Sequence, residues 1–168
     1  MTQRENISKW FLYALVTGLF VLLQSVVLNR ISIWNVHPFL PPMLVAMVAM
    51  WEGRGAGIGF ALVFGFLTDL TANAPIPCFY MVLFVLIALM TSVIARRLFP
   101  AGFLCALVLA VLAMLPHALF TALLLDGQNG LALSAAVSLA GRELVVSAPF
   151  VLLFYWPYRR VYRTANQN

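Results

Sequence analysis

The stretch GIGFALVFGFLTDL, residues 57–70, decides the fold class, because it is a long apolar run that closes on a carboxylate. Counting back from Asp69 in steps of four gives Gly65, Ala61 and Gly57. Residues four apart lie on one side of an α-helix, and small residues there let a neighbouring backbone approach closely. We therefore predict a helix over residues 56–70 that packs through Gly57, Ala61 and Gly65.

The composition of the whole chain indicates that this helix lies in a membrane. The chain has 168 residues, of which 64% are hydrophobic and 9% are charged, and its mean hydropathy is +1.00. Soluble domains are about half apolar and about a quarter charged. The sequence therefore predicts an all-α polytopic membrane protein with a single transmembrane domain over residues 1–168 and no separate soluble domain.

Six apolar segments are candidates for crossing the membrane, which takes about 20 helical residues for a hydrocarbon core of about 30 Å. They cover residues 10–28, 38–51, 56–70, 79–95, 102–125 and 134–156. The segment 38–51 is short, so crossing, re-entry and burial among the other helices stay open for it. Pro41 and Pro42 suit its first turn, where their missing N–H groups cost little.

The basic residues favour a topology with both termini in the cytoplasm. Six spans place eight basic residues inside and only Arg30 of the loop residues outside; the eight are Arg4, Lys9, Arg54, Arg96, Arg97, Arg159, Arg160 and Arg163. Without a crossing at 38–51, the best five-span topology leaves Arg4 and Lys9 outside. The net charge of +5 thus indicates topology and contact with anionic membrane lipids, and we expect no nucleic-acid partner.

Asp69 either ends its helix in contact with water or is buried as an anchor within the bundle. The second alternative is supported because intramembrane acids usually face protein and pair. Arg142 lies about eight residues into the last segment, from where its side chain reaches toward the level of Asp69. The neighbouring Glu143 points about 100° away and needs another partner. We predict a buried Asp69–Arg142 ion pair; the alternative is a surface helix before about residue 145, with both charges wet.

No set of residues typical of an enzyme is apparent: there is no Ser/His/Asp set, metal-ligand cluster or carboxylate pair. The glycines at positions 53, 55, 57 and 59 match neither the dinucleotide fingerprint nor the phosphate loop. We therefore expect a non-enzymatic protein with no metal and no cofactor. His117, which follows Pro116, is expected to be a hydrogen-bonded histidine within the bundle, with a proton relay or ligand group as the alternative.

The order of these segments resembles the rod shape-determining protein MreD family. The likeness runs from HPFLPPMLVAMVAMW (37–51) through GIGFALVFGFLTDL, a further apolar helix and a basic inner loop to APFVLLFYWPYRRVYR (148–163). MreD proteins have a proline-led second helix, a third helix that ends G-x-x-x-D and a basic cytoplasmic tail. Gly65 and Asp69 match that ending.

The resemblance implies a scaffold of the cell-elongation machinery in the bacterial cytoplasmic membrane, which helps to organise peptidoglycan synthesis. The implied partners are an MreC-like membrane protein, an actin-like MreB reached directly or through other proteins, and the wall-synthesising glycosyltransferase and transpeptidase. The family fold is similar to the substrate-binding subunit of energy-coupling-factor vitamin transporters, which supplies the alternative function.

A transporter subunit of that kind would differ from a scaffold in two features of the sequence. It would use Ala14 and Gly18 on the first helix against a transmembrane coupling partner. It would also need convergent polar and aromatic groups at the outer end of the bundle. The polar residues expected at that end are Asn35, His37, Asn73, Asp126 and Arg142.

Overall fold

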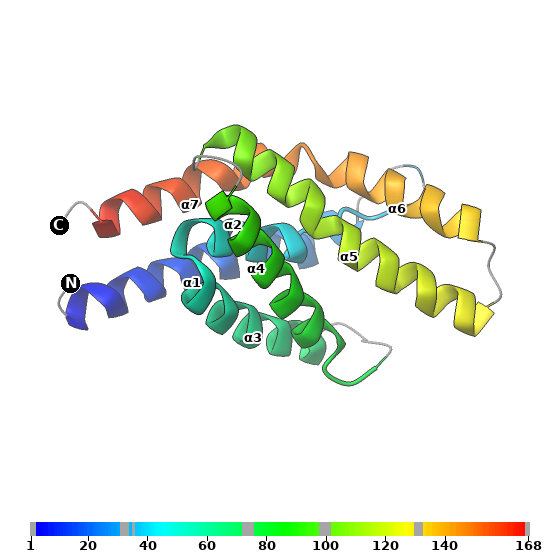
Figure 1. Cartoon of the computed structure of the whole chain (residues 1–168), viewed down its shortest axis with the longest axis horizontal. Coiled ribbons are helices and arrows are strands. Elements are labelled where there is room, and N and C mark those ends of the chain that lie inside the picture. The colour runs from blue at the N-terminus through cyan, green and yellow to red at the C-terminus, as the bar shows by residue number, and fades with distance from the viewer. Residues whose placement is uncertain are drawn as a thin grey trace.

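A computed structural model describes residues 3–30, 34, 36–71, 76–97, 102–129 and 133–166. These residues form seven α-helices and one short 3₁₀ turn (Figure 1). The helices are α1 (Gln3–Val26), α2 (Pro41–Glu52), α3 (Arg54–Thr71), α4 (Phe79–Arg97), α5 (Phe103–Asn129), α6 (Leu133–Ser147) and α7 (Phe150–Asn166), and the 3₁₀ turn is η1 (Leu28–Arg30). The expected helical segments all appear, with ends that differ by a few residues except in the first and last segments.

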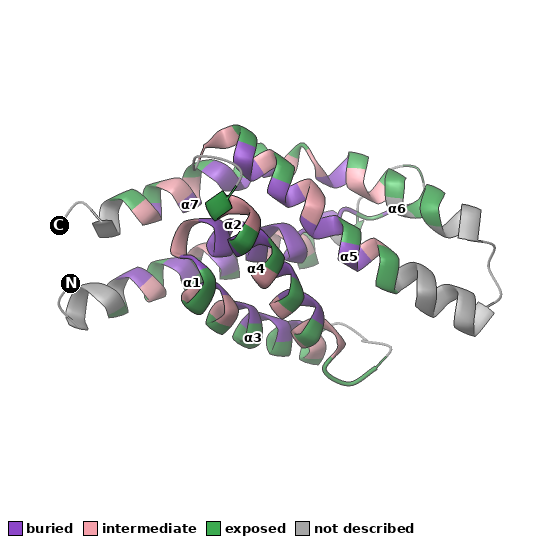
Figure 2. Cartoon of the chain, in the orientation of Figure 1, coloured by how far each residue is buried: buried purple, intermediate pink, exposed green. Residues whose placement is uncertain are grey.

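The short helix α2 is the centre of the bundle. Pro41 and Pro42 occupy its first two positions, as predicted, and every residue from Pro41 to Met50 is buried (Figure 2). It contacts α3, α4, α5 and α7. Gly53 ends the helix with a φ of +80°, a conformation that glycine adopts without strain. The structure shows this segment buried among the other helices, and whether it also crosses the membrane stays a prediction.

Helices α3 and α4 form an antiparallel pair that packs against α2. The buried residues of α3 recur at helical spacing, and they are Gly57, Ala61, Phe64, Gly65 and Thr68. The opposite side of α3 is exposed and apolar, as Val63 and Leu70 show. Such a helix buries one side against protein and turns the other to an apolar surrounding.

The last expected segment, 134–156, is not one helix but two, and this corrects the prediction of one continuous helix. Helix α6 ends at Ser147, α7 begins at Phe150, and the two are bent by 53°. Pro149 explains the break, because its ring removes a backbone donor and disfavours the helical conformation of Ala148. Helix α5 also runs past its expected end at residue 125 as far as Asn129, so Asp126 lies within the helix.

Three helices in the described residues are long and apolar enough to cross a membrane, and the bent pair α6–α7 makes a fourth if it counts as one span. The three run over Lys9–Val26, Phe79–Arg97 and Phe103–Phe120. The chain is thus all-helical in its described elements and compatible with a multi-pass membrane protein. Crossing by α2 and α3 as well, which six spans require, stays a prediction.

Candidate functional site

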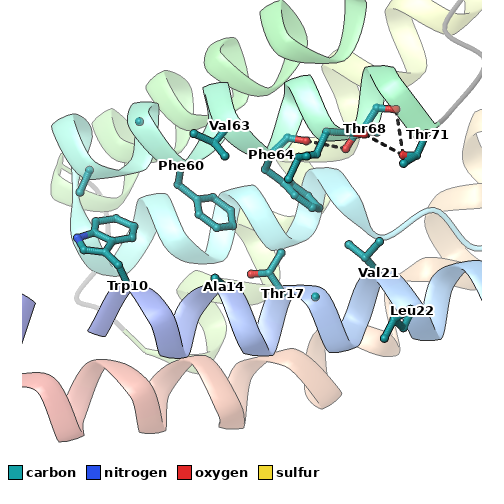
Figure 3. Close-up of a pocket in the computed structure, with 14 residues that line it drawn as sticks. Trp10, Ala14, Thr17, Val21, Leu22, Phe60, Val63, Phe64, Thr68 and Thr71 are labelled. Carbon is teal, nitrogen blue, oxygen red and sulfur yellow. Dashed lines mark hydrogen bonds between the residues drawn. The ribbon is translucent and has the colours of Figure 1, made fainter. Parts of the chain in front are cut away.

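An apolar groove of about 800 Å³ separates α1 from α3 (Figure 3). Side chains from both helices point into the space between them, with α1 along one wall and α3 along the other. The groove-lining residues are Trp10, Ala14, Thr17, Gly18, Val21 and Leu22 of α1, and Ala56, Gly59, Phe60, Val63, Phe64, Leu67, Thr68 and Thr71 of α3.

Helix α1 leaves the groove open because it packs against α7 on its other side (Figure 1). The Thr17 and Tyr158 hydroxyls lie 2.8 Å apart in a buried hydrogen bond. The ring of Tyr13 stacks on Tyr158 at 5.8 Å, and Phe20 meets Phe154 edge-on at 4.4 Å. These contacts hold α1 beside α7 rather than beside α3.

A buried ion pair joins α1 to the end of α2, and the sequence reasoning missed it. The ammonium of Lys9 donates to the carboxylate of Glu52, and both side chains are less than a tenth exposed. The Tyr13 hydroxyl donates to the second carboxylate oxygen of Glu52 at 2.9 Å. The sequence analysis uses Lys9 only to predict the topology. Their pairing depends on how α1 and α2 lie together, which no local pattern encodes.

Asp69 has a partner different from the one predicted, and this corrects the proposed ion pair. Its two carboxylate oxygens accept hydrogen bonds from the backbone N–H groups of Tyr80 at 2.9 Å and Met81 at 3.1 Å. Both donors lie in the first turn of α4, where N–H groups lack helical partners and the helix dipole favours an anion. Arg142 is exposed on α6 and forms no ion pair with Asp69.

The three small residues of the predicted packing face, Gly57, Ala61 and Gly65, are buried in the structure. A Cβ atom on Gly57 would lie 2.8 Å from the Cα of Ala49 on α2. One on Gly65 would lie 2.5 Å from the Cα of Met81 on α4. Backbone stands at both places, so this side of α3 contacts its neighbours closely.

A second polar cluster surrounds His117, near the middle of α5. Its Nε2 lies 3.4 Å from a carboxylate oxygen of Glu143 on α6, and the ring of Phe39 stacks on the imidazole at 4.6 Å. His117 is 7% exposed, and its Nδ1 has no hydrogen-bond partner. The sequence reasoning expected a hydrogen-bonded histidine here and left Glu143 without a named partner.

Candidate metal ligands do not gather at one place in the described residues. Groups of three or more His, Cys, Asp or Glu side chains able to hold a metal ion are absent among them. Of the polar residues expected at the outer end, Asn35, Asn73 and the side chain of Asp126 lie outside the described residues. His37 is exposed, as is Arg142.

Comparison with known proteins identifies no relative of this chain. No protein-family model, no curated protein and no solved structure matches this chain.

Proposed function

We propose that this protein is a non-enzymatic scaffold of the MreD type, which acts in the bacterial cytoplasmic membrane and binds the transmembrane helix of a partner in the groove between α1 and α3. The groove itself carries the proposal. It is long, apolar and bounded by two helices that do not fill it. The groove extends from Trp10 to Leu22 along α1, about three helical turns, which suits a further helix that lies along it.

Small residues on both walls of the groove support a helix as the occupant. A Cβ atom built on Gly18 of α1 or Gly59 of α3 would meet nothing within 4 Å. On the other side of α3, the backbone of α2 occupies the space beside Gly57, and that of α4 occupies the space beside Gly65. Helix α3 thus has one small-residue side that is occupied within the chain and one that is open to a partner, and close approach at small residues drives helix association in membranes.

The threonine hydroxyls of the groove are already satisfied within the chain. The hydroxyl of Thr17 is bonded to Tyr158, and those of Thr68 and Thr71 donate to the carbonyls of Phe64 and Leu67. Recognition of a polar small molecule needs free donors and acceptors that converge on it. An apolar helix needs none, so the lining favours a protein partner over a polar ligand.

The topology that we propose has six crossings and both termini in the cytoplasm. Gln24 of α1 bonds the Pro38 carbonyl and the Leu40 N–H, while Lys9 of α1 bonds Glu52. Residues 38–52 therefore run antiparallel to α1 over nearly its whole apolar length, which supports a crossing in spite of the shortness of α2. A reporter fused after Asn168 should be cytoplasmic, and one inserted after Gly130 should be external.

The scaffold function is tested by substitutions in the open glycines. Gly18→Leu combined with Gly59→Leu should abolish co-purification with an MreC-like partner from a rod-shaped host and give rounded cells. Gly55→Leu is the matched control, because Gly55 also has nothing within 4 Å and does not line the groove. Normal partner recovery and normal shape with the double variant, present at normal abundance, would refute the groove as the binding surface.

The cluster around His117 favours a second candidate, the substrate-binding subunit of an energy-coupling-factor vitamin transporter. The unpartnered Nδ1 of His117 and the stacked ring of Phe39 are groups that a bound heterocycle would use. Calorimetry of the purified protein with a panel of vitamins separates the two candidates. Saturable binding lost in His117→Leu would support the transporter subunit, and absence of heat with every vitamin would favour the scaffold.

A further inference from the structure

The outward side of α7 changes its chemistry along the helix. Its exposed residues recur at helical spacing on the side away from the bundle, and they are Leu152, Leu153, Trp156, Arg160 and Arg163. The opposite side is buried and consists of Val151, Phe154, Tyr155, Tyr158 and Val161. One exposed surface therefore passes from aliphatic to aromatic to cationic side chains in the direction of the chain.

This order matches the depth profile of a bilayer. Tryptophan concentrates at the membrane–water interface, aliphatic side chains lie deeper and arginine lies at the headgroups. Trp156 is 70% exposed, so its indole is free to occupy that interface. At 1.5 Å per residue, Arg160 and Arg163 lie about 6 and about 10 Å beyond Trp156 along the axis. That displacement brings both guanidinium groups to the level of the lipid phosphates.

Neighbouring helices mark the same level independently. The ring of Trp51, at the end of α2, lies 6.3 Å from that of Tyr155 and 4.9 Å from that of Tyr162. Tyr155 directly precedes Trp156 on α7, and Tyr162 lies less than two turns beyond it. Trp10 of α1 contacts Tyr13, whose ring stacks on Tyr158. Three tryptophans on three helices thus gather near one level, which is typical of an aromatic belt.

The two arginines have no carboxylate partner in the described residues. No ion pair of Arg160 or Arg163 occurs there, and Glu52, the described carboxylate at this end of the bundle, is bound by Lys9 and Tyr13. Positions three apart on a helix place their Cβ atoms about 5–6 Å from each other. Two guanidinium groups so spaced can close on one phosphate, which arginine binds with paired hydrogen bonds.

We propose that Trp156, Arg160 and Arg163 form a binding site for an acidic phospholipid. The two guanidinium groups hold its phosphate, the indole lies at its glycerol backbone, and its acyl chain lies along Leu152 and Leu153. A lipid is the occupant rather than an acidic peptide, because the cationic end continues directly into an apolar surface on the same side of α7. This site does not depend on the scaffold role proposed above.

The test is a titration of the full chain in neutral detergent with phosphatidylglycerol, with the first bound lipid followed by native mass spectrometry. Near an anionic lipid surface each arginine contributes about fivefold to the binding constant, so Arg160→Gln with Arg163→Gln should raise the Kd about 20- to 30-fold. Arg160→Lys with Arg163→Lys should retain much of the affinity. Phosphatidylcholine should bind weakly to all variants.

The matched control is Arg54→Gln with Arg97→Gln, which removes two exposed arginines on other helices and changes the net charge equally. It should leave the Kd for phosphatidylglycerol within about threefold. An unchanged Kd in the α7 double variant, or equal weakening in the control, would overturn the site. The site would also be overturned if the α7 double variant kept its affinity for phosphatidylglycerol but no longer bound an acidic peptide. Since Arg160 and Arg163 are exposed, the thermal unfolding midpoint should stay at the wild-type value.

Discussion

Asp69, near the end of α3, accepts a hydrogen bond of 2.9 Å from the backbone N–H of Tyr80 at the start of α4. Its second oxygen accepts from Met81, so one carboxylate serves two donors of the first turn. The end of α3 is thus joined to the start of α4 by an anion at a helix N-terminus, where the helix dipole favours it. The acid at the end of the apolar run is an anchor that bonds backbone and not a basic side chain.

This arrangement predicts unequal effects of two substitutions. Asp69→Ala should lower the free energy of unfolding by about 1–2 kcal/mol, because two helix-end donors lose their acceptor. Arg142→Ala should change it by less than about 0.5 kcal/mol, because the side chain is exposed. Denaturant unfolding in detergent measures both. If the two single variants lost equal stability and the double variant lost less than their sum, the ion pair between Asp69 and Arg142 would be supported instead.

The two sides of α3 should respond differently to added volume. Gly65→Ala places a methyl group 2.5 Å from the Cα of Met81, a backbone atom that cannot yield, and overpacking of this kind costs about 1–3 kcal/mol. Gly59→Ala meets nothing within 4 Å and should leave the unfolding midpoint unchanged or raise it, because alanine favours a helix. Equal tolerance at both positions, measured by thermal unfolding, would contradict the close contact of α3 with α4.

Breaking the buried pair of Lys9 and Glu52 should be costly. Lys9→Met leaves the carboxylate of Glu52 buried without its cation, and such a loss costs about 3–5 kcal/mol. The double variant Lys9→Met with Glu52→Gln should recover part of that loss, since no uncompensated charge remains. Folded yield and unfolding free energy report the difference. A double variant as unstable as the sum of the two single variants would argue against a coupled pair.

The hydroxyl of Tyr158 should matter more than that of Tyr162. Tyr158→Phe keeps the ring stacked on Tyr13 but removes the partner of Thr17, at a cost of about 0.5–1.5 kcal/mol. Tyr162→Phe is the control, because the Tyr162 hydroxyl makes no hydrogen bond within the described residues. The double variant Tyr158→Phe with Thr17→Val should lose less than the two single variants together. Thermal unfolding of all four proteins decides the matter.

Some features of the fold were predictable because they depend on residues close together in the chain. The prolines at 41 and 42 begin α2, and the spacing of Gly57, Ala61 and Gly65 places them on one side of α3. The break at Pro149 was predictable in the same way, since a proline disfavours helix at the residue before it. The sequence reasoning overlooked that signal because the residues around Pro149, from Leu144 to Trp156, carry no charge.

The amino-acid sequence by itself determined the apolar helical character of the chain, the start of α2 and the small-residue side of α3, because helical periodicity and backbone chemistry are local. Only the tertiary structure decided that Asp69 bonds the first turn of α4, that Lys9 meets Glu52 and that α1 turns toward α7 and leaves a groove beside α3. Each of these depends on the relative rotation and depth of helices far apart in the chain. Packing of whole helices sets those two quantities, and several partners of similar chemistry compete for every charged side chain.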